Sequence, residues 1–405
     1  MIGEKGDVMR ILMVNKYLWP KGGAETYVLK LGKRLASLGH EVEYFGMADE
    51  RNVAGNSAGI YADNIDFHKA SIEHLTYPFR IIYSHSAEKK IHAVLDAFKP
   101  DIVHLNNFNY QLTPSIIYEI KKYNIPIVYT AHDVQLVCPN HKLRNERTEG
   151  LCRKCYGGKY MNCVKNNCIH SSKIRSILGA AEAWFYRKLH TYSLIDEVIC
   201  PSKFMEMEIE HNIDIEKRTK TLYNFIEEIK PEGKERENYV LYFGRYSEEK
   251  GIRTLIKAAK ALPKIQFVFA GAGDMENEIN KVENIRNMGF KSGKELHDII
   301  EKAAFTVLPS EWSENCPFTV MESQTLLTPV LGARIGGIPE LIDEGVTGML
   351  FESGNAEELT EKIEYLYNNR ELCREMSKNC ASISYDTVSA YAERILKIYS
   401  NHIKE

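Results

Sequence analysis

The chain has 405 residues, of which 44% are hydrophobic and 26% charged, and its formal net charge at pH 7 is -3. This composition is typical of soluble globular proteins, the length suits two domains of roughly 200 residues each, and the charge gives no reason to expect a nucleic-acid partner. No run approaches the roughly 20 apolar residues of a membrane span and the start lacks the pattern of a secretory signal, so we expect a cytoplasmic protein.

Short apolar runs alternate with amphipathic helical patterns along both halves of the chain, which is typical of parallel α/β sheets. In the first half, a helix is expected over residues 24–38, because Gly39 is a common residue just beyond a helix end. The strands predicted in this half are Arg10–Val14, Glu41–Phe45, Ile102–Leu105, Ile125–Thr130 and Glu197–Cys200.

In the second half the predicted strands are Tyr239–Phe243, Ile265–Ala270, Ala304–Leu308 and Pro329–Leu331. Residues 229–238 are rich in charge and contain Pro231 and Gly233, which predicts a linker between the two sets of strands. The expected domains are therefore residues 1–228 and 229–384, followed by a last helix over residues 385–405. Doubly wound domains bind ligands at the carboxyl ends of their strands, so the ligand is expected in a cleft between the two domains.

The segment from residue 309 to residue 322 is the most informative part of the chain. It follows a predicted buried strand, and Pro317 is expected at the first position of a helix, where its missing N–H costs nothing. The amides of the next two residues, Phe318 and Thr319, would then be donors at the positive end of that helix. Such a helix end is a ready site for a phosphate group.

Two acids flank this predicted phosphate site, Glu314 before the helix and Glu322 one turn inside it. Acids beside an anion are favourable if they accept hydrogen bonds from hydroxyl groups of the same anionic ligand. A nucleotide sugar has this character, with a diphosphate between ribose hydroxyls and sugar hydroxyls. Two solvated glutamates at this spacing are also common by chance, so the spacing alone does not decide.

Glu314 and Glu322 in this setting resemble the Glu-x7-Glu motif of the retaining glycosyltransferases of family 4. Further segments match in the family's order: Asn15 to Glu25 with Lys21-Gly22-Gly23, Tyr129 to Asp133, Gly244 to Gly251, and the glycine-bearing segments 271–273, 288–290 and 336–340. The resemblance covers nearly the whole chain. It implies the GT-B fold, two doubly wound Rossmann-like domains facing across a cleft, with the last helix crossing back to brace the first domain.

Breaking the bond between a sugar and a diphosphate leaves negative charge on the departing group, which an enzyme has to neutralise. Arg245 and Lys250 can supply two fixed cations, and in the family the matching pair grips the diphosphate, so no cofactor is expected for catalysis. The resemblance implies that Glu314 holds hydroxyls of the transferred sugar and that Glu322 holds the ribose hydroxyls. The alternative is that the two cations are surface residues paired with Glu248 and Glu249.

The resemblance gives roles to further residues around the expected cleft. The loop with Gly22 and Gly23 would lie over the donor phosphate and the acceptor entrance, and His132 would contact the transferred sugar; a simple turn and a packed histidine are the alternatives. The backbone from Met288 to Phe290 would meet the base, and Gly271 and Gly273 would leave room for the nucleotide. Retention of the anomeric configuration is likewise implied by the resemblance alone.

Five of the nine cysteines lie between residues 138 and 168. In a reducing cytoplasm, a Cys-x2-Cys pair with further cysteines nearby favours zinc over disulfides. Some family 4 relatives carry a similar pattern, which matches Cys138, Cys152, Cys155 and Cys168, with Cys163 as an alternate fourth ligand. The hypothesis is a structural zinc site of four thiolates, and the alternative is a set of free thiols without metal.

The segment after this loop is basic: residues 151–195 contain eight lysines or arginines and one acid, Glu182. Cations and aromatic residues together can seat a helix at an anionic membrane surface, which would suit a lipid-linked acceptor. The alternative is a helix that packs its apolar face inside the protein.

The sequence therefore predicts a retaining, hexosyltransferase-type glycosyltransferase that takes a sugar from a nucleoside diphosphate donor, by default a UDP-sugar, to a glycan or lipid-linked acceptor. Cell-surface polysaccharide synthesis is the expected process, in the cytoplasm or at the inner face of the membrane. The rival hypotheses are a transferase for a small soluble acceptor, a catalytically silent nucleotide-sugar-binding or regulatory protein, and a nucleic-acid binder that uses the cysteines. The four charged site residues count against the silent protein, and the acidic remainder of the chain counts against nucleic acid.

Overall fold

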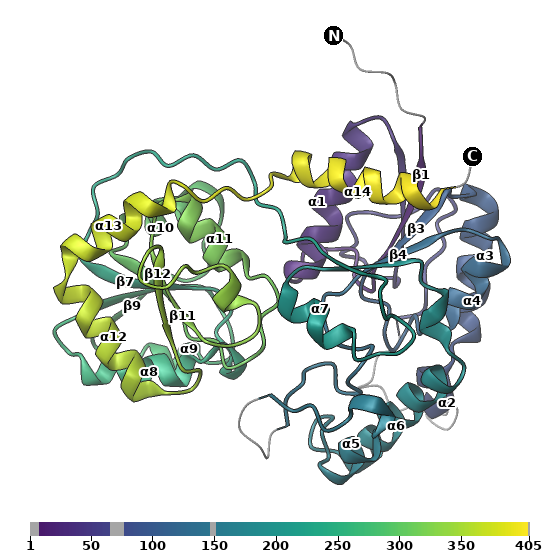
Figure 1. Ribbon diagram of the computed structural model, residues 1–405, viewed down its shortest axis with the longest axis horizontal. Helices are drawn as coiled ribbons and strands as arrows, with labels where there is room; N and C mark the ends of the chain where they lie inside the picture. The colour runs from purple at the N-terminus through teal and green to yellow at the C-terminus, as the bar shows by residue number, and fades with distance from the viewer. Residues whose placement is uncertain (1–7, 65–76, 146–150, 404–405) are drawn as a thin grey trace. The chain divides into compact units, whose positions relative to one another are not determined.

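A computed structural model describes residues 8–64, 77–145 and 151–403 of the chain (Figure 1). The chain divides into two compact units: unit 1 consists of residues 1–223 and 388–405, and unit 2 of residues 224–387. Each unit contains a six-stranded sheet in which every described pairing is parallel. The predicted α/β class, with two doubly wound domains, is therefore confirmed.

The sheet of unit 1 has the strand order β2-β1-β3-β4-β5-β6. Its strands are β1 (Arg10–Val14), β2 (Glu41–Phe45), β3 (Ile102–Leu105), β4 (Ile127–Thr130), β5 (Glu197–Cys200) and β6 (Thr219–Thr221). The strands β3 and β4 are buried along their whole length, as expected for parallel strands covered on both faces. Five of these strands agree with the prediction, and the short, polar β6 was missed.

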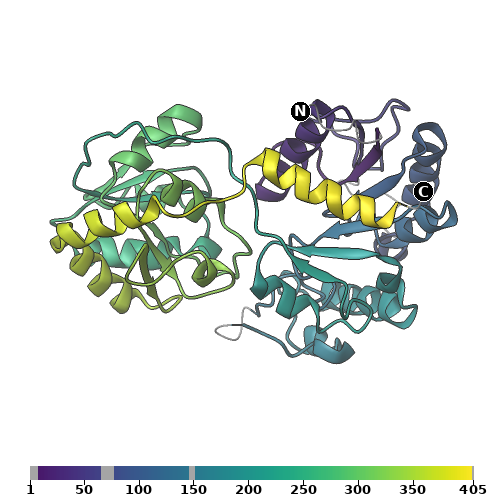
Figure 2. The ribbon, with the colours of Figure 1, turned by 45° about the horizontal axis from the view of Figure 1, so that its top comes forward.

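The helices of unit 1 are α1 (Gly23–Ser37), α2 (Tyr77–Ile82), α3 (His85–Phe98), α4 (Ser115–Lys122), α5 (Met161–Lys165), α6 (Lys173–Lys188), α7 (Lys203–Ile209) and α14 (Val388–His402), with 3₁₀ turns η2 (Tyr156–Gly158) and η3 (Thr191–Leu194). The last helix packs against α1, and the two lie side by side in Figures 1 and 2. The predicted final helix thus belongs to unit 1, although its expected end at residues 404–405 lies outside the described residues.

A buried network of hydroxyl and imidazole groups fixes α14 in unit 1. The hydroxyl of Tyr391 lies 2.9 Å from that of Tyr27 on α1, which in turn lies 3.1 Å from the Thr130 hydroxyl. Nearby, the Tyr399 hydroxyl lies 2.6 Å from Nδ1 of His104, whose Nε2 is 2.7 Å from the same Thr130 hydroxyl. Buried polar groups are costly when they are unpaired, so this network favours one position of α14 in addition to the apolar packing of the helix.

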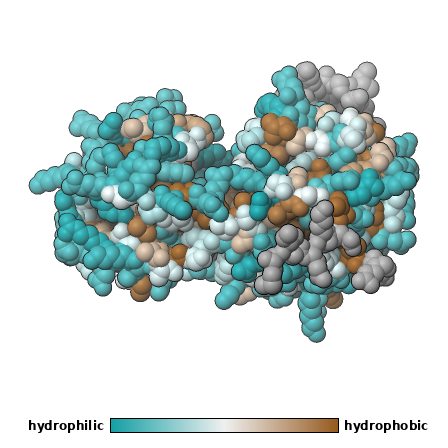
Figure 3. Space-filling model, turned by 90° about the horizontal axis from the view of Figure 1, so that it is seen from above, coloured by the Kyte–Doolittle hydropathy of each residue, from teal (hydrophilic) through white to brown (hydrophobic). Residues whose placement is uncertain are grey.

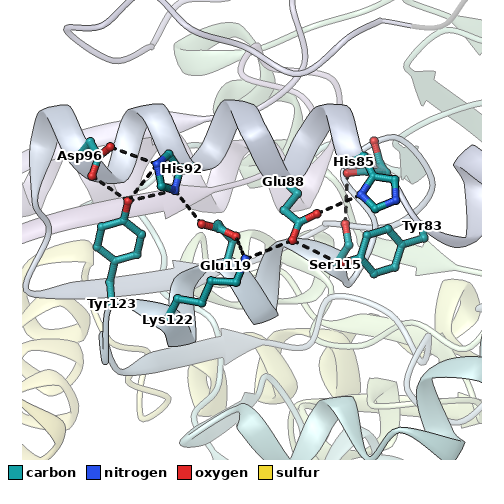
Figure 4. A network of polar contacts seen from close by, with 10 residues as sticks. Tyr83, His85, Glu88, His92, Asp96, Ser115, Glu119, Lys122 and Tyr123 are labelled. Carbon is teal, nitrogen blue, oxygen red and sulfur yellow. Dashed lines mark hydrogen bonds and ion pairs between the residues drawn. The ribbon is translucent and has the colours of Figure 1, made fainter.

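A second polar network joins α3 to α4 on the outside of unit 1 (Figure 4). Glu119 accepts from Nζ of Lys122 at 2.5 Å and lies 2.7 Å from Nδ1 of His92, while the Tyr123 hydroxyl donates to Asp96 at 2.7 Å. Burial raises the pKa of Glu119, but hydrogen bonds from Lys122 and His92 outweigh it and leave the pKa below its usual value. The carboxylate therefore stays ionised and holds the two helices in register.

The sheet of unit 2 has the strand order β12-β11-β10-β7-β8-β9, which is the Rossmann order with its first strand in the middle. Its strands are β7 (Tyr239–Phe243), β8 (Gln266–Ala270), β9 (Ile285–Asn287), β10 (Phe305–Leu308), β11 (Val330–Ala333) and β12 (Gly348–Phe351). The helices are α8 (Ile252–Ala261), α9 (Glu276–Ile279), α10 (Gly293–Lys302), α11 (Phe318–Thr325), α12 (Ala356–Asn368) and α13 (Arg370–Cys380), with 3₁₀ turns η4 (Glu248–Lys250) and η5 (Ile338–Glu340). The four predicted strands are present, and β9 and β12 were missed.

The boundary between the units falls at residues 223 and 224, before the predicted boundary at 228 and 229. The predicted linker, residues 229–238, is packed onto unit 2. Glu301 on α10 accepts from the amides of Glu232 at 3.0 Å, of Gly233 at 2.5 Å and of Lys234 at 3.0 Å. Arg236 donates to the carbonyl of Ala303 at 2.6 Å. Three backbone amides and the charged side chain of Arg236 therefore attach this segment to unit 2.

Hydrophilic side chains dominate the face seen in Figure 3, with apolar residues scattered among them. Among the described residues, no helix is long and apolar enough to cross a membrane.

Candidate functional site

A lysine–glutamate pair lies in the loops that follow the two central strands of unit 2. Lys250 ends the turn η4 after β7, and Glu314 lies in the loop between β10 and α11. The lysine Nζ donates to Oε1 of Glu314 at 2.5 Å, and the hydroxyl of Ser310 donates to the same oxygen at 2.9 Å. With the two charged side chains only 25% and 13% exposed, the pair is partly desolvated and well fixed.

The position of this pair follows from the strand order. β7 and β10 are neighbours, and the chain runs from β7 outward to β8 and β9 on one side, then returns to β10 and continues to β11 and β12 on the other. The gap between β7 and β10 is thus the topological switch point of the sheet. Ligands of such sheets bind at the carboxyl ends of the strands at this point. Lys250 and Glu314 follow those two strands.

Backbone contacts between the two loops hold the pair in place. The amide of Glu311 donates to the carbonyl of Glu249 at 3.0 Å. Gly251 has a φ of +71°, and a Cβ at this position would lie 1.8 Å from the carbonyl oxygen of Pro309. Glycine is therefore required here both for its left-handed backbone and for the close approach of the neighbouring loop.

Arg245 lies on the same loop as Lys250 but is held less firmly. Its guanidinium donates to Glu249 at 2.9 Å, and its side chain is 66% exposed. A surface ion pair of this kind contributes little and breaks easily. At this loop the structure therefore offers one fixed cation, Lys250, and one exposed cation, Arg245. The partner of Arg245, Glu249, is one of the two acids that the alternative hypothesis named.

The helix that follows Glu314 begins one residue later than predicted. Pro317 has φ -72° and ψ 121°, an extended conformation, and is the N-cap residue of α11, so Phe318 is the first helical residue. The expectation that proline is the first helical residue was wrong, because Pro317 has an extended backbone and lies just before the helix. Val320 donates to the Pro317 carbonyl at 3.1 Å. The amides of Phe318 and Thr319 precede that bond, at the positive end of the helix, and Glu322 follows half-buried in the next turn.

The glycine-bearing loops after β8 and β9 have packing functions of their own. Gly273 has a φ of +154°, and a Cβ there would lie 2.4 Å from the carbonyl of Tyr246. Gly273 thus allows the loop that carries Arg245 to approach closely. This packing is a reason for a glycine here in addition to the predicted one, which was space for the nucleotide. Met288 is half-buried and donates its amide to Phe269 at 2.7 Å, whereas Phe290 is 75% exposed.

In unit 1, His132 follows β4 and is held by two contacts. Its Nε2 lies 2.9 Å from Oδ1 of Asn106, an acceptor, so this nitrogen carries the proton. Its ring lies edge-on to that of Tyr27 with centroids 4.9 Å apart. Burial lowers the pKa of His132 to about 3, so the imidazole is neutral at physiological pH. This geometry suits a hydrogen-bonding role and opposes a proton-shuttle role.

The glycine pair of unit 1 opens its first helix. Gly22 is the N-cap residue of α1 and Gly23 is its first residue. A Cβ on Gly22 would lie 3.3 Å from a carboxylate oxygen of Glu25. Burial raises the pKa of this carboxyl group. Next to them, Nζ of Lys21 lies 3.6 Å from the ring centroid of Tyr17. The loop thus presents a short backbone segment with a cation beside it.

Of the predicted residues, Gly22, Gly23 and His132 belong to unit 1, and the remaining donor-site residues belong to unit 2. Sequence reasoning missed Asn106, which orients His132, and Ser310, which holds Glu314. Both follow a buried strand within two residues. Polar residues at strand ends were the signal that could have found them.

The cysteine cluster has its thiols in one region without the arrangement of a metal site. Cys155 and Cys163 are buried with Tyr160 and Ile169, and Cys168 packs against them. Burial, together with the nearby thiols of Cys138 and Cys168, raises the pKa of Cys155 to about 12. Across the described part of the chain, no group of three or more histidine, cysteine or acidic side chains could hold a metal ion. The geometry therefore does not support the zinc site, which stays a prediction.

Comparison with protein families now identifies the class. Residues 21–228 match the model of Glycosyltransferase Family 4, and residues 224–382 match that of Glycosyl transferases group 1. The chain belongs to glycosyltransferase family 4, as its motifs predicted.

Individual relatives cover part of the chain. It is 28% identical over 217 residues to an uncharacterized glycosyltransferase of Methanocaldococcus jannaschii, 52% of this chain and 60% of that protein. It is 29% identical over 173 residues to alpha-D-kanosaminyltransferase of Streptomyces kanamyceticus, 40% of this chain and 45% of the relative. It is 27% identical over 173 residues to N,N'-diacetylbacillosaminyl-diphospho-undecaprenol alpha-1,3-N-acetylgalactosaminyltransferase of Campylobacter jejuni, 41% and 45% respectively. The chain thus spans about half the length of these relatives.

Two solved structures share the fold over nearly the whole chain. The Anabaena protein HepE, solved in complex with UDP, has a TM-score of 0.67 at 17% identity, covering 97% of this chain and 100% of that one. Sucrose-phosphate synthase of Thermosynechococcus elongatus has a TM-score of 0.72 at 17% identity, covering 96% and 98%. The fold is therefore GT-B, as expected.

Proposed function

We propose that this chain transfers a sugar from a nucleoside diphosphate sugar to a glycan or lipid-linked acceptor, with retention of the anomeric configuration, in the synthesis of a cell-surface polysaccharide. The observation that carries the proposal is the Lys250–Glu314–Ser310 cluster at the switch point of unit 2. A cation and a fixed carboxylate lie there, and a helix begins four residues after that carboxylate, at Phe318, which suits the anionic and hydroxylated parts of such a donor.

The chemistry assigned to unit 2 is stabilisation of the leaving group. The bond between the anomeric carbon and the diphosphate oxygen breaks, the electron pair goes to the diphosphate, and the acceptor oxygen bonds to the carbon while its proton passes to the departing diphosphate. Lys250 and the exposed Arg245 neutralise the departing diphosphate. The first amides of α11, from Phe318 and Thr319, add partial positive charge at the same edge of the sheet.

The two acids select and orient the donor in this proposal. A carboxylate has about four acceptor sites, of which Lys250 and Ser310 use two on Glu314. The others can accept from sugar hydroxyls, and Glu322 can accept from ribose. The exposed ring of Phe290 offers a face to the base, for which we take uracil because HepE was solved with UDP.

The acceptor is assigned to unit 1, where the neutral His132 contacts the transferred sugar and the Gly22–Gly23 loop borders the acceptor path. The name of the Campylobacter jejuni relative contains a diphospho-undecaprenol, which supports a lipid-linked acceptor. We accordingly propose that the protein works in the cytoplasm at the inner face of the membrane.

A thermal-shift panel of UDP-, GDP-, ADP- and dTDP-sugars at millimolar concentration, without added metal, tests the proposal. A donor at a hundred times its dissociation constant stabilises by about 2.7 kcal/mol, which raises the melting temperature by several degrees. A selective shift identifies the donor, and release of the matching nucleoside diphosphate then reports turnover. Binding without turnover on any glycan or lipid acceptor would favour the silent nucleotide-sugar-binding protein, and no shift with any donor would contradict the proposal.

A further inference from the structure

Helix α6 presents three large apolar side chains to solvent, whereas its Tyr186 is buried and its Leu178 and Phe185 are half-buried. Ile174, Ile177, Ala181 and Trp184 recur at intervals of three and four residues, which places them on one face of the helix. The three large members are 72%, 46% and 55% exposed. Leu189, just beyond the helix end, is also exposed. An ordinary surface helix keeps its apolar face inside the protein, so an additional apolar face turned to solvent is unusual.

The inner face of α6 shows that this orientation is fixed. Ser176, Gly179, Ala180, Glu182 and Tyr186 are buried. The hydroxyl of Ser176 accepts from the amide of Ile169 at 3.0 Å. A Cβ on Gly179 would lie 2.3 Å from a methyl carbon of Ile169, so α6 approaches this segment closely. Rotating the apolar face inward would break these contacts.

The charges on α6 have one sign at its surface. Lys173 and Arg175 lie in the first turn, and Arg187 and Lys188 in the last. The single acid of the helix, Glu182, is buried. Nζ of Lys188 lies 5.0 Å from the ring centroid of Trp184, which joins the cationic and apolar parts of the face. The exposed surface of α6 is therefore apolar along its middle and positive at both ends.

We propose that this outer face of α6 docks on an anionic membrane surface. The apolar side chains enter the boundary between headgroups and acyl chains, Trp184 lies at the headgroup level, and the cations at both ends contact anionic headgroups. In Figure 1, α6 lies with α5 at the margin of unit 1, away from β1 and α14. The inference concerns binding alone and holds whether or not the proposed transfer reaction is correct.

Charge complementarity selects a membrane over the other occupants of such a face. A second copy of this chain would bring the same positive charges into contact around the shared interface, which repels. A protein partner would need an acidic rim around an apolar groove. An anionic lipid surface offers both an apolar interior and negative charge without further requirements, and its attraction weakens with salt because the charges are exposed.

Co-sedimentation of the full chain with vesicles tests the inference, without any donor present. Vesicles of phosphatidylcholine mixed with phosphatidylglycerol are compared with phosphatidylcholine alone, at low and high salt. We expect binding to the mixed vesicles at low salt, at least a tenfold loss in a double variant carrying Ile177→Ser and Trp184→Ser, and a similar loss in one carrying Lys173→Gln and Lys188→Gln. Met207→Ser, which alters an exposed apolar residue on α7, is the matched control and should bind like the wild type.

Tryptophan fluorescence gives a second readout that a folding defect does not reproduce. The chain has three tryptophans, and the mixed vesicles should shift its emission to shorter wavelength in the wild type but not in a Trp184→Phe variant. All variants should keep the melting temperature and the donor-induced shift of the wild type. Wild-type protein that stays in solution with anionic vesicles, or surface variants that bind as well as the wild type, would overturn the inference. So would a wild-type dimer that the apolar double variant abolishes, since a second copy would then cover the face.

Discussion

Replacing Lys250 with alanine separates the catalytic role of this residue from its structural one. The ammonium group donates to Glu314 at 2.5 Å, and its removal leaves a carboxylate that is 13% exposed with Ser310 as its described partner. A buried charge without its partner costs several kcal/mol, but the lysine is 25% exposed and water can replace it. We therefore expect a loss of about 1–2 kcal/mol in unfolding free energy.

The catalytic loss should be larger than the structural one. Removing one preorganised charge contact to the leaving group costs on the order of 3 kcal/mol at the transition state, which is roughly a hundredfold in kcat. The assay measures release of nucleoside diphosphate at saturating donor, beside thermal unfolding of the same preparation. A melting temperature lowered by a few degrees with turnover reduced a hundredfold or more is the expected result.

Arg253→Ala is the matched control for this experiment. Arg253 is a cation on α8, one turn beyond Lys250, with a 52% exposed side chain that pairs with Glu248 at the surface. Its loss should change the unfolding free energy by less than about 1 kcal/mol and leave kcat unchanged. Wild-type turnover in Lys250→Ala, or equal losses in both variants, would refute the assignment of Lys250 to the leaving group.

Three further predictions follow from local geometry. Burial lowers the pKa of His104 and of His132 to about 3 each, so unfolded chains take up protons between pH 6.5 and 3 that folded chains do not. The unfolding free energy measured in urea should thus decrease as the pH is lowered over that range, by up to roughly 1.4 kcal/mol per pH unit for each histidine. His132→Gln should make this pH dependence less steep, and the exposed His85→Gln should not. The reverse result would contradict the prediction. Gly251→Ala places a Cβ 1.8 Å from a carbonyl oxygen and should lower the melting temperature far more than Gly345→Ala, which has a φ of +82° and open space; equal shifts would refute the contact. Metal analysis of protein never exposed to chelator should give one zinc per chain if the cysteine prediction holds, and well under one rejects it.

Strands that are buried along their whole length were predictable, because they appear in the sequence as uninterrupted runs of apolar residues. Tyr239–Phe243 is buried at every position and was found with its exact bounds. The three missed strands are three or four residues long and lie at sheet edges, where Thr219–Thr221 and Ile285–Asn287 carry polar residues toward solvent. Such strands form because a neighbouring strand pairs with them, and their own residues show no alternation of apolar and polar side chains.

The charged residues of the candidate site were found from their spacing and setting, whereas their partners required the fold. Nothing in the sequence near Glu314 indicates that Lys250, 64 positions away, donates a hydrogen bond to it. This contact arises because β7 and β10 are neighbours in the sheet. The same holds for Asn106 and His132, 26 positions apart. Charge also misled: Glu301 lies far along the chain from the segment it anchors, so residues 229–238 looked solvated.

The placement of α14 in unit 1 has a consequence for how the protein is made. Tyr27 and His104 belong to the first third of the sequence, but Tyr391 and Tyr399, the hydroxyl partners described for them, are among its last fifteen residues. During synthesis from the amino end, all of unit 2 emerges before α14 does. Unit 1 therefore lacks a helix until unit 2 has been made, and a nascent chain halted at residue 387 would hold all of unit 2 together with a unit 1 whose α1 has no α14 to pack against.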